Sequence, residues 1–198
     1  MIITIARQCG CQGDFVGKKL AERFKLPLYD KKHIRELAEK CSMAGRYPGF
    51  FEEKETNLFL TAIAANLPQN MAQNTAIKAL TTTLGNQSAV IIGRCSNFVY
   101  EREPDVIRIF LCGTLDYRVE QIAKAHDISQ GKAKQLVEET DARRASYHEY
   151  YTGQVWGFGG HYDLCIDESR LGADGVVDMI CAYISKLSGL HKINESFS

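Results

Sequence analysis

The sequence of 198 residues carries no net charge, because 24 Lys and Arg side chains balance 24 Asp and Glu. A chain without a basic excess is not a histone-like or polybasic binder of nucleic-acid polymers, although a local basic site is compatible with it. The charges are unevenly spread: residues 1–99 hold 13 basic and 8 acidic side chains, and residues 100–198 hold 11 and 16. The positive first half points to a small anionic ligand there.

Long apolar runs and cysteine motifs are also missing. No stretch approaches the roughly 18 consecutive apolar residues of a membrane span, and Arg7 interrupts the first apolar run too early for a signal-peptide core. The seven cysteines show neither CxxC nor Cys/His finger spacing. Cys9 and Cys11 lie close together, but a zinc site needs about four clustered ligands. We therefore expect a cytoplasmic protein with reduced thiols, no metal site of its own and no membrane partner.

The composition, 45% apolar and 24% charged residues, is typical of one soluble globular domain. Short β-branched runs alternate with segments of helical periodicity, and that alternation predicts an α/β fold with a doubly wound parallel sheet. The predicted strands are 2–6, 27–29, 89–92, 106–112 and 162–166. The predicted helices begin near residue 14, at Asp30, after residue 112, at Ser129 and near Asp174, with weaker helices over 51–84 interrupted near Pro68 and a frayed tail after Gly189.

Polar and glycine-containing segments follow several of these strands. In doubly wound sheets, ligands bind at the carboxyl ends of the strands. This places residues 7–13, Asp30, Gly93-Arg94 and Gly113 on one rim. The rim is therefore the predicted position of the binding site.

The segment after the first strand has the order strand, glycine-containing loop, helix, which suits phosphate binding by backbone N–H groups and a helix N-terminus. Gly10 and Gly13 can adopt the positive φ that such a loop needs. The GxxxxGK[ST] pattern is absent, since Gln12 stands where glycine belongs and Lys19 where Ser or Thr belongs. GxGxxG is absent too. From these residues alone, a phosphate loop and a plain turn are both open.

Three longer segments resemble the cytidylate kinase-like family. They are IARQCGCQGDFVGKKLAERFKLPLYDKKHI, AVIIGRCSNFVY and TDARRASYHEYYTGQVWGFGGHYDLCIDESRLGADGVVDMI. The resemblance implies a P-loop kinase-like, three-layer α/β/α domain with a five-stranded parallel sheet. It also implies phosphoryl transfer from ATP to CMP or dCMP, with Mg²⁺ bound through the phosphates. The core would be 1–41, 89–128 and 162–190, with a helical nucleoside-monophosphate-binding insert at about 42–88 and a lid at about 129–161.

The resemblance also implies roles for individual residues. The loop would wrap the β-phosphate of ATP, with nearby basic side chains supplying charge; the phosphate-binding residues are Arg7, Gly10, Cys11, Gln12, Gly13, Asp14, Phe15 and Lys18. The residues facing the acceptor nucleotide would be Asp30, Gly93 and Arg94. Arg118, Arg143 and Arg144 would be catalytic, because phosphoryl transfer needs positive charge around spreading oxygens and arginine offers a flat, permanently charged fork.

The loop departs from the pattern of well-matched nucleoside monophosphate kinases, which carry Lys and then Ser or Thr where Gly13 and Phe15 stand here. Asp14 competes with a phosphate, and Phe15 has no oxygen to support Mg²⁺. An alternative is therefore a non-catalytic nucleotide-binding or regulatory domain. A Rossmann oxidoreductase would need GxGxxG and an acidic residue after the second strand, and Asp30 meets only the second condition.

Several site residues also have plain structural interpretations. Asp30 is a favoured helix N-cap, and Arg94 is compatible with a solvated strand end. Arg118 is compatible with a surface ion pair to Glu120 or Glu101. Trp156 suits either stacking on a base or anchoring the glycine-rich loop around it.

Overall fold

The computed structural model describes residues 1–52 and 69–195. Five parallel strands form one sheet in the order β2-β3-β1-β4-β5, which confirms the predicted fold class. The strands are β1 (Ile2–Arg7), β2 (Leu28–Tyr29), β3 (Ala89–Ile92), β4 (Val106–Cys112) and β5 (Leu164–Asp167). Strand β5 begins two residues later than predicted.

Strand β1 lies at the centre of the sheet and is buried on both faces. Ile3 pairs with Val90 on one side and with Ile107 on the other. Residues 2–6 are all buried, because parallel sheets are covered by helices on both sides. The β-branched run at the start of the chain is therefore the middle of the core, and the segment that follows it is at the middle of the carboxyl edge.

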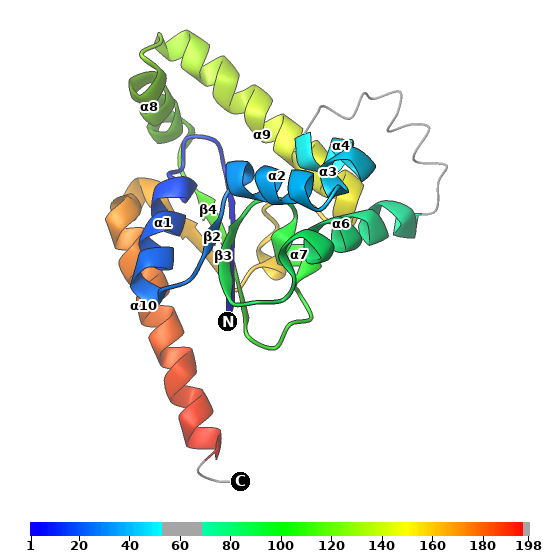
Figure 1. Ribbon diagram of the computed structural model, residues 1–198. Helices are drawn as coiled ribbons and strands as arrows, with labels where there is room; N and C mark the ends of the chain where they lie inside the picture. The colour runs from blue at the N-terminus through cyan, green and yellow to red at the C-terminus, as the bar shows by residue number, and fades with distance from the viewer. Residues whose placement is uncertain (53–68, 196–198) are drawn as a thin grey trace.

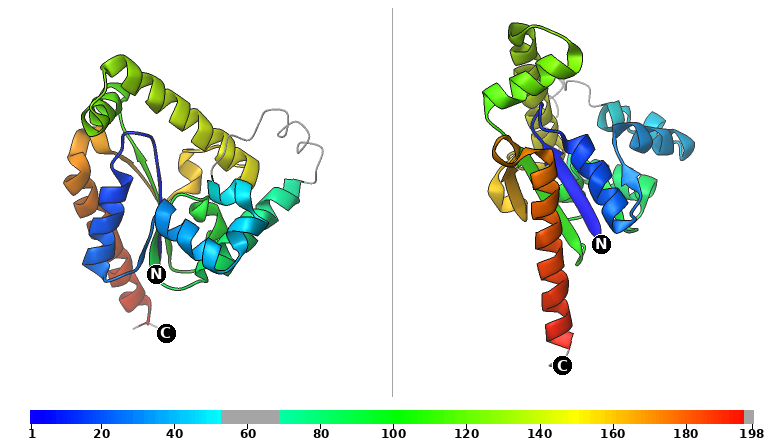
Figure 2. Two further views of the ribbon diagram at one scale, coloured as in Figure 1. Left: turned by 45° about the horizontal axis from the view of Figure 1, so that its top comes forward. Right: turned by 90° about the vertical axis from the view of Figure 1, so that its left-hand side faces the viewer.

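Helices cover both faces of the sheet (Figures 1 and 2). On one face α1 (Gly13–Phe24) and α10 (Glu168–Glu195) pack on the side chains of Ile3 and Ile5. The other face is covered by α2 (Lys31–Lys40), α4 (Pro48–Glu52), α6 (Gln69–Leu84) and α7 (Ser96–Val99), with α3 (Met43–Arg46) beside them. The arrangement is the predicted three-layer α/β/α sandwich.

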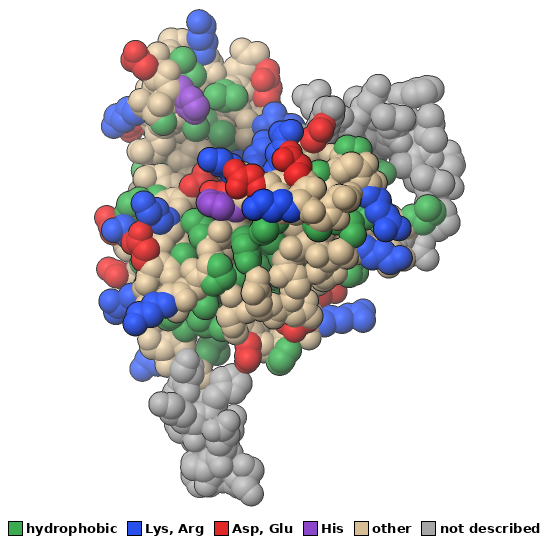
Figure 3. Space-filling model, viewed as in Figure 1, with side chains coloured by type: hydrophobic (Ala, Val, Ile, Leu, Met, Phe, Trp, Pro, Cys, Tyr) green, Lys and Arg blue, Asp and Glu red, His purple; other side chains and the backbone are tan. Residues whose placement is uncertain are grey.

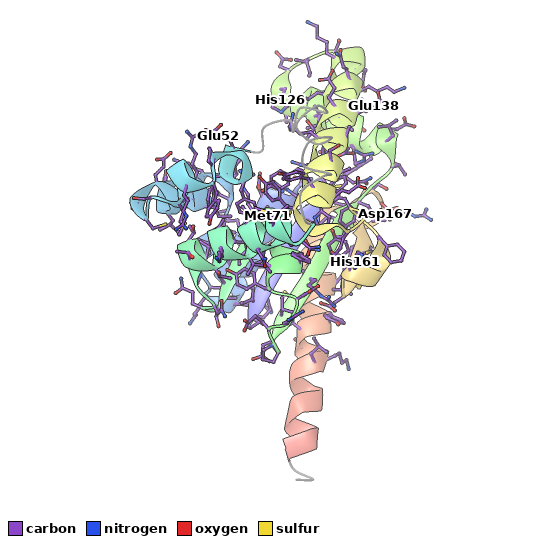
Figure 4. The ribbon with its side chains drawn as sticks, turned by 90° about the vertical axis from the view of Figure 1, so that its right-hand side faces the viewer. Glu52, Met71, His126, Glu138, His161 and Asp167 are labelled. Carbon is purple, nitrogen blue, oxygen red and sulfur yellow. The ribbon has the colours of Figure 1, made fainter. Side chains whose placement is uncertain are left out.

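Above the sheet, α8 (Leu115–His126) and α9 (Gln130–Thr152) form a helical hairpin with its own small core. The Ser129 hydroxyl caps α9 by accepting from the N–H of Lys132. Figure 4 shows His126 and Glu138 near the outer end of this hairpin and His161 near the opposite end of α9. There Tyr147 and Tyr151 pack on Phe50, so these tyrosines are packing residues.

The C-terminal helix differs from the sequence-based expectation. It begins at Glu168, breaks at Gly172 (φ 68°, ψ 165°) and then continues to Glu195, so the helix extends past Gly189, where a frayed tail was expected. A glycine is required at the break because the backbone there has positive φ. The interruption expected near Pro68 lies outside the described residues. In the described part of the chain, no helix is long and apolar enough to cross a bilayer.

Candidate functional site

The loop between β1 and α1 is held by side chains from distant parts of the chain. The N–H of Cys9 donates to Asp141 Oδ1 (2.7 Å), and the N–H of Gln12 donates to both carboxylate oxygens of Glu168 (3.0 Å each). Gly10 has φ +88°, and a Cβ there would lie 2.4 Å from the backbone oxygen of Arg118. The loop therefore needs glycine at position 10 for both its backbone angle and its close approach to α8.

Arg118 lies behind this loop. It is 7% exposed and donates to the carbonyl oxygens of Cys9 (3.1 Å) and Gly113 (3.0 Å), as well as to Asp141 Oδ2 (2.6 Å). Its acidic partner is thus Asp141 rather than Glu120 or Glu101. Because its hydrogen bonds are directed at the loop backbone, Arg118 fixes the position of the loop relative to the α8–α9 hairpin.

Glu168 was not singled out from the sequence. It is the first residue of α10, it is buried, and besides Gln12 it accepts a hydrogen bond from the hydroxyl of Tyr117 (3.1 Å). Burial raises the pKa of Glu168, and the hydrogen bonds from Gln12 and Tyr117 oppose that rise. Its position directly after a strand was the one available signal. The Glu168 carboxylate therefore accepts the hydrogen bond of one backbone N–H group of the loop, that of Gln12.

A cleft of about 540 Å³ opens between this loop and the hairpin; we call it the loop cleft. Its hairpin wall comes from α8 and α9, including Thr140 and Arg144. All but one of the predicted phosphate-binding residues line it: Arg7, Gly10, Cys11, Gln12, Gly13, Asp14 and Phe15. Lys18, which is exposed on α1, is not among the described residues that line the loop cleft.

The turn after β3 has an unusual backbone. Gly93, Arg94 and Cys95 all have positive φ (75°, 56° and 53°), a conformation that costs about 1–2 kcal/mol per non-glycine residue. The turn buries Arg94, which is 3% exposed. Its Nη2 donates to the carbonyl oxygen of Phe51 (2.7 Å), and its guanidinium lies 5.9 Å from the ring centroid of Tyr147. Arg94 is therefore buried and hydrogen-bonded within the protein, and it is not a solvated side chain at the end of a strand.

Beside this turn lies a smaller cavity of about 30 Å³, which we call the turn cavity. It is lined by the end of β1, the turn after β3, the start of α7, three residues of α9, and Trp156. The Trp156 ring also packs edge-on against Phe110 (5.3 Å between centroids). Asp30 is not among the described residues that line either space. It caps α2 by accepting from the N–H of His33 (2.9 Å).

Two arginines line both the loop cleft and the turn cavity: Arg7 and Arg144. The Arg7 side chain passes two glycines, since a Cβ on Gly13 would lie 2.9 Å from its Cγ and a Cβ on Gly93 would lie 2.8 Å from its Nη1. Arg144 Nη1 donates to the Arg7 carbonyl oxygen (2.9 Å). The two spaces therefore meet at a pair of guanidinium groups from β1 and α9.

Of the adjacent pair on α9, Arg144 alone reaches this junction. Arg143 donates to Thr140 Oγ1 (3.5 Å), and it is absent from the described residues around both spaces. Basic side chains, with acidic ones beside them, gather in the hollow between the hairpin and α2 (Figure 3). The structure thus brings most of the predicted phosphate-binding residues together with Gly93, Arg94 and Arg144, whereas Lys18, Asp30, Arg118 and Arg143 are not among the described residues that line the two spaces.

The loop itself offers few side-chain ligands for a metal ion. Among residues 1–52 and 69–195, no three His, Cys, Asp or Glu side chains form a group that could bind one. Burial, together with the charge of Glu168, raises the pKa of the Cys11 thiol, so this side chain stays protonated. Phe15 offers no oxygen where a phosphate loop places a hydroxyl. A Mg²⁺ ion used here would have to be carried by phosphate oxygens.

A five-stranded parallel sheet, with a glycine-containing loop between its central strand and the first helix, defines the P-loop kinase fold. The chain matches crystal structures of this class. A gluconokinase from Sinorhizobium meliloti (12% identity, TM-score 0.56, 97% of this chain and 95% of that one) and a shikimate kinase from Bacteroides thetaiotaomicron (11%, 0.51, 93% and 98%) share its fold. The chain belongs to the cytidylate kinase-like family, whose model matches residues 2–170.

Two further relatives cover nearly the whole chain. A cytidylate kinase from Methanocorpusculum labreanum is 25% identical over 191 residues, which are 94% of this chain and 98% of that protein. The crystal structure of an uncharacterized protein from Eubacterium ventriosum is 30% identical, with a TM-score of 0.71 over 94% of this chain and 98% of that one. The resemblance noted in the sequence is therefore confirmed at the level of the family.

Proposed function

We propose that the protein transfers a phosphoryl group from ATP to a pyrimidine nucleoside monophosphate, CMP or dCMP. The observation that carries this proposal is the junction of two spaces at Arg7 and Arg144. One space is bordered by a glycine-containing loop and a helix N-terminus, which suit the phosphates of a donor. The other is lined by Arg94 in its fixed turn, which suits the phosphate of an acceptor. A group passing between them would be flanked by permanent positive charge.

Under this proposal, the protein contributes position and charge and no covalent chemistry. The triphosphate of ATP lies along the loop cleft, and bound Mg²⁺ supplies charge neutralisation through the phosphate oxygens. The acceptor phosphate lies at the turn cavity beside Arg94. Arg7 is held between Gly13 and Gly93, so its guanidinium is fixed before the substrates arrive. Arg144 stabilises the equatorial oxygens in the transition state.

The other arginines have supporting roles in this proposal. Arg118 positions the loop through the carbonyl oxygens of Cys9 and Gly113. Arg143 and Lys18 add to the positive potential near the donor site, and Asp30 acts on the acceptor side through α2, whose first turn it caps. The segment 129–161 would act as the lid, with α9 connecting the donor and acceptor sides.

A coupled assay of ADP formation, with ATP and each of the common nucleoside monophosphates, tests the proposal. Turnover that depends on the acceptor, and that is fastest with CMP or dCMP, is the expected result. ATP alone is the control, because hydrolysis by water gives ADP without an acceptor. The absence of turnover with every acceptor would remove the catalytic claim.

A second function is favoured by one specific contact, the hydrogen bonds from the Gln12 N–H to Glu168. This donor is taken up inside the protein, and no lysine stands in the loop. A non-catalytic nucleotide-binding or regulatory domain would need less from the loop than a kinase does. Calorimetry that finds ATP binding without turnover would select this function over the first.

A further inference from the structure

Two uncharged side chains in the turn cavity have buried nitrogens with no hydrogen-bond partner within 3.5 Å in the described part of the chain. Asn97 and His148 are each 4% exposed and line the same cavity. Asn97 Nδ2 and His148 Nε2 are buried and have no hydrogen-bond partner within 3.5 Å among residues 1–52 and 69–195. Gln154, whose Oε1 is also buried without a partner in that part of the chain, is the side chain that interacts with the His148 imidazole. Folding two such nitrogens away from water is costly unless something else accepts their hydrogen bonds.

The two residues come from different elements, so their meeting is a product of the tertiary structure. Asn97 lies in α7, directly after the turn that buries Arg94. His148 lies in α9, one helical turn beyond Arg144 and therefore on the same face of that helix. Both thus lie next to an arginine that lines the cavity.

The size and charge of the cavity limit what it can take. About 30 Å³ admits a group of a few heavy atoms and excludes a whole nucleoside. Arg7, Arg94 and Arg144 already provide three positive charges. A phosphate group bound there therefore needs, in addition, uncharged hydrogen-bond donors that fix its orientation. An amide N–H and an imidazole N–H meet that need.

We propose that Asn97 Nδ2 and His148 Nε2 donate hydrogen bonds to the phosphate oxygens of the acceptor. These residues orient the phosphate, while the arginines supply the attraction. This inference rests on the proposed function, because it takes the turn cavity to be the acceptor side. It adds two uncharged specificity residues that distinguish a phosphate from a larger or apolar group.

The experiment measures binding to the full-length protein by calorimetry with three probes: inorganic phosphate, CMP and cytidine. The variants are Asn97→Leu and His148→Leu, which replace the donor groups with apolar ones, and His148→Gln, whose amide retains a donor. Asn74→Leu is the matched control, because Asn74 is exposed on α6 and lies outside both spaces. Thermal unfolding is recorded for each protein.

We expect Asn97→Leu and His148→Leu to weaken the binding of CMP and of phosphate about tenfold each, the value of one good hydrogen bond. The affinity for cytidine, and that of the control for every probe, should stay within about twofold of wild type by the same measure. His148→Gln should recover most of the loss. Asn97→Leu should unfold at no lower temperature than wild type, because it removes a buried donor that no described residue satisfies.

Three results would overturn the inference. The first is a variant that unfolds earlier but binds CMP and phosphate as wild type does, which would make the residue purely structural. The second is an equal loss for cytidine, which would assign the contact to the nucleoside. The third is a wild-type protein that binds neither phosphate nor CMP. If phosphate binding depends on Asn97 and His148 while no acceptor is phosphorylated, the inference stands and the proposed function fails.

Discussion

His148 allows a prediction about stability whose size follows from the structure. Burial, together with the charge of His161, lowers the pKa of His148 from 6.5 to about 4. In the unfolded chain the imidazole takes up a proton below pH 6.5, while the folded protein keeps it neutral until about pH 4. The unfolded state therefore binds more protons in this window, and the free energy of unfolding falls as the pH is lowered through it.

The magnitude follows from the two pKa values. Each pKa unit corresponds to about 1.4 kcal/mol, so His148 accounts for a loss of about 3 kcal/mol over the whole window and about 2 kcal/mol between pH 7 and pH 5. His148→Gln places a group that does not titrate at the same position.

Urea unfolding of wild type and of His148→Gln at pH 7, 6 and 5 measures the effect. Acidification should destabilise the wild type more than the variant, by about 2 kcal/mol at pH 5 relative to pH 7. Comparing the two proteins cancels the contributions of the other titrating groups. If the two free energies change in parallel within about 0.5 kcal/mol, a typical limit for such differences, His148 is not held neutral by burial and the reasoning is refuted.

Three further perturbations probe the junction and the loop. Arg144→Ala should lower kcat in the coupled assay by about 10³-fold, as loss of an arginine finger does, whereas Arg143→Ala should cost far less; equal losses would contradict the assignment to Arg144. Gly93→Ala places a Cβ 2.8 Å from Arg7 Nη1 at φ +75°, and should cost about 1–2 kcal/mol in urea unfolding and more than about tenfold in kcat, because the Cβ displaces the Arg7 guanidinium; a stability loss with unchanged kcat would exclude a role for Arg7. Burial raises the pKa of Glu168 above 4.5 in the folded protein, so the wild type should lose stability as the pH rises through that pKa. Glu168→Gln should not show this loss, and identical melting-temperature profiles of the two proteins from pH 4 to pH 8 would show that burial does not raise the pKa of Glu168.

The local elements followed from neighbouring residues. The β-branched runs of β1 and β3 predicted buried strands, since such side chains fit the two covered faces of a parallel sheet. Asp30 and Ser129 predicted helix starts because their short side chains satisfy the first backbone N–H groups. The start of the last strand and the start of the last helix depend on contacts between elements, and they were misplaced by two and six residues; the break at Gly172 was not predicted.

For the site, the sequence determined which loop lies at the carboxyl edge of the sheet and which residue types line it. Only the tertiary structure selected Arg144 over Arg143, paired Arg118 with Asp141, and brought Glu168 to the N–H of Gln12, 156 positions away. Helix and strand propensities act between near neighbours, whereas these contacts exist only after the sheet and the hairpin have packed together. For the same reason, the net charge of the chain or of its halves does not locate the site, because folding brings arginines from both halves of the sequence to one junction.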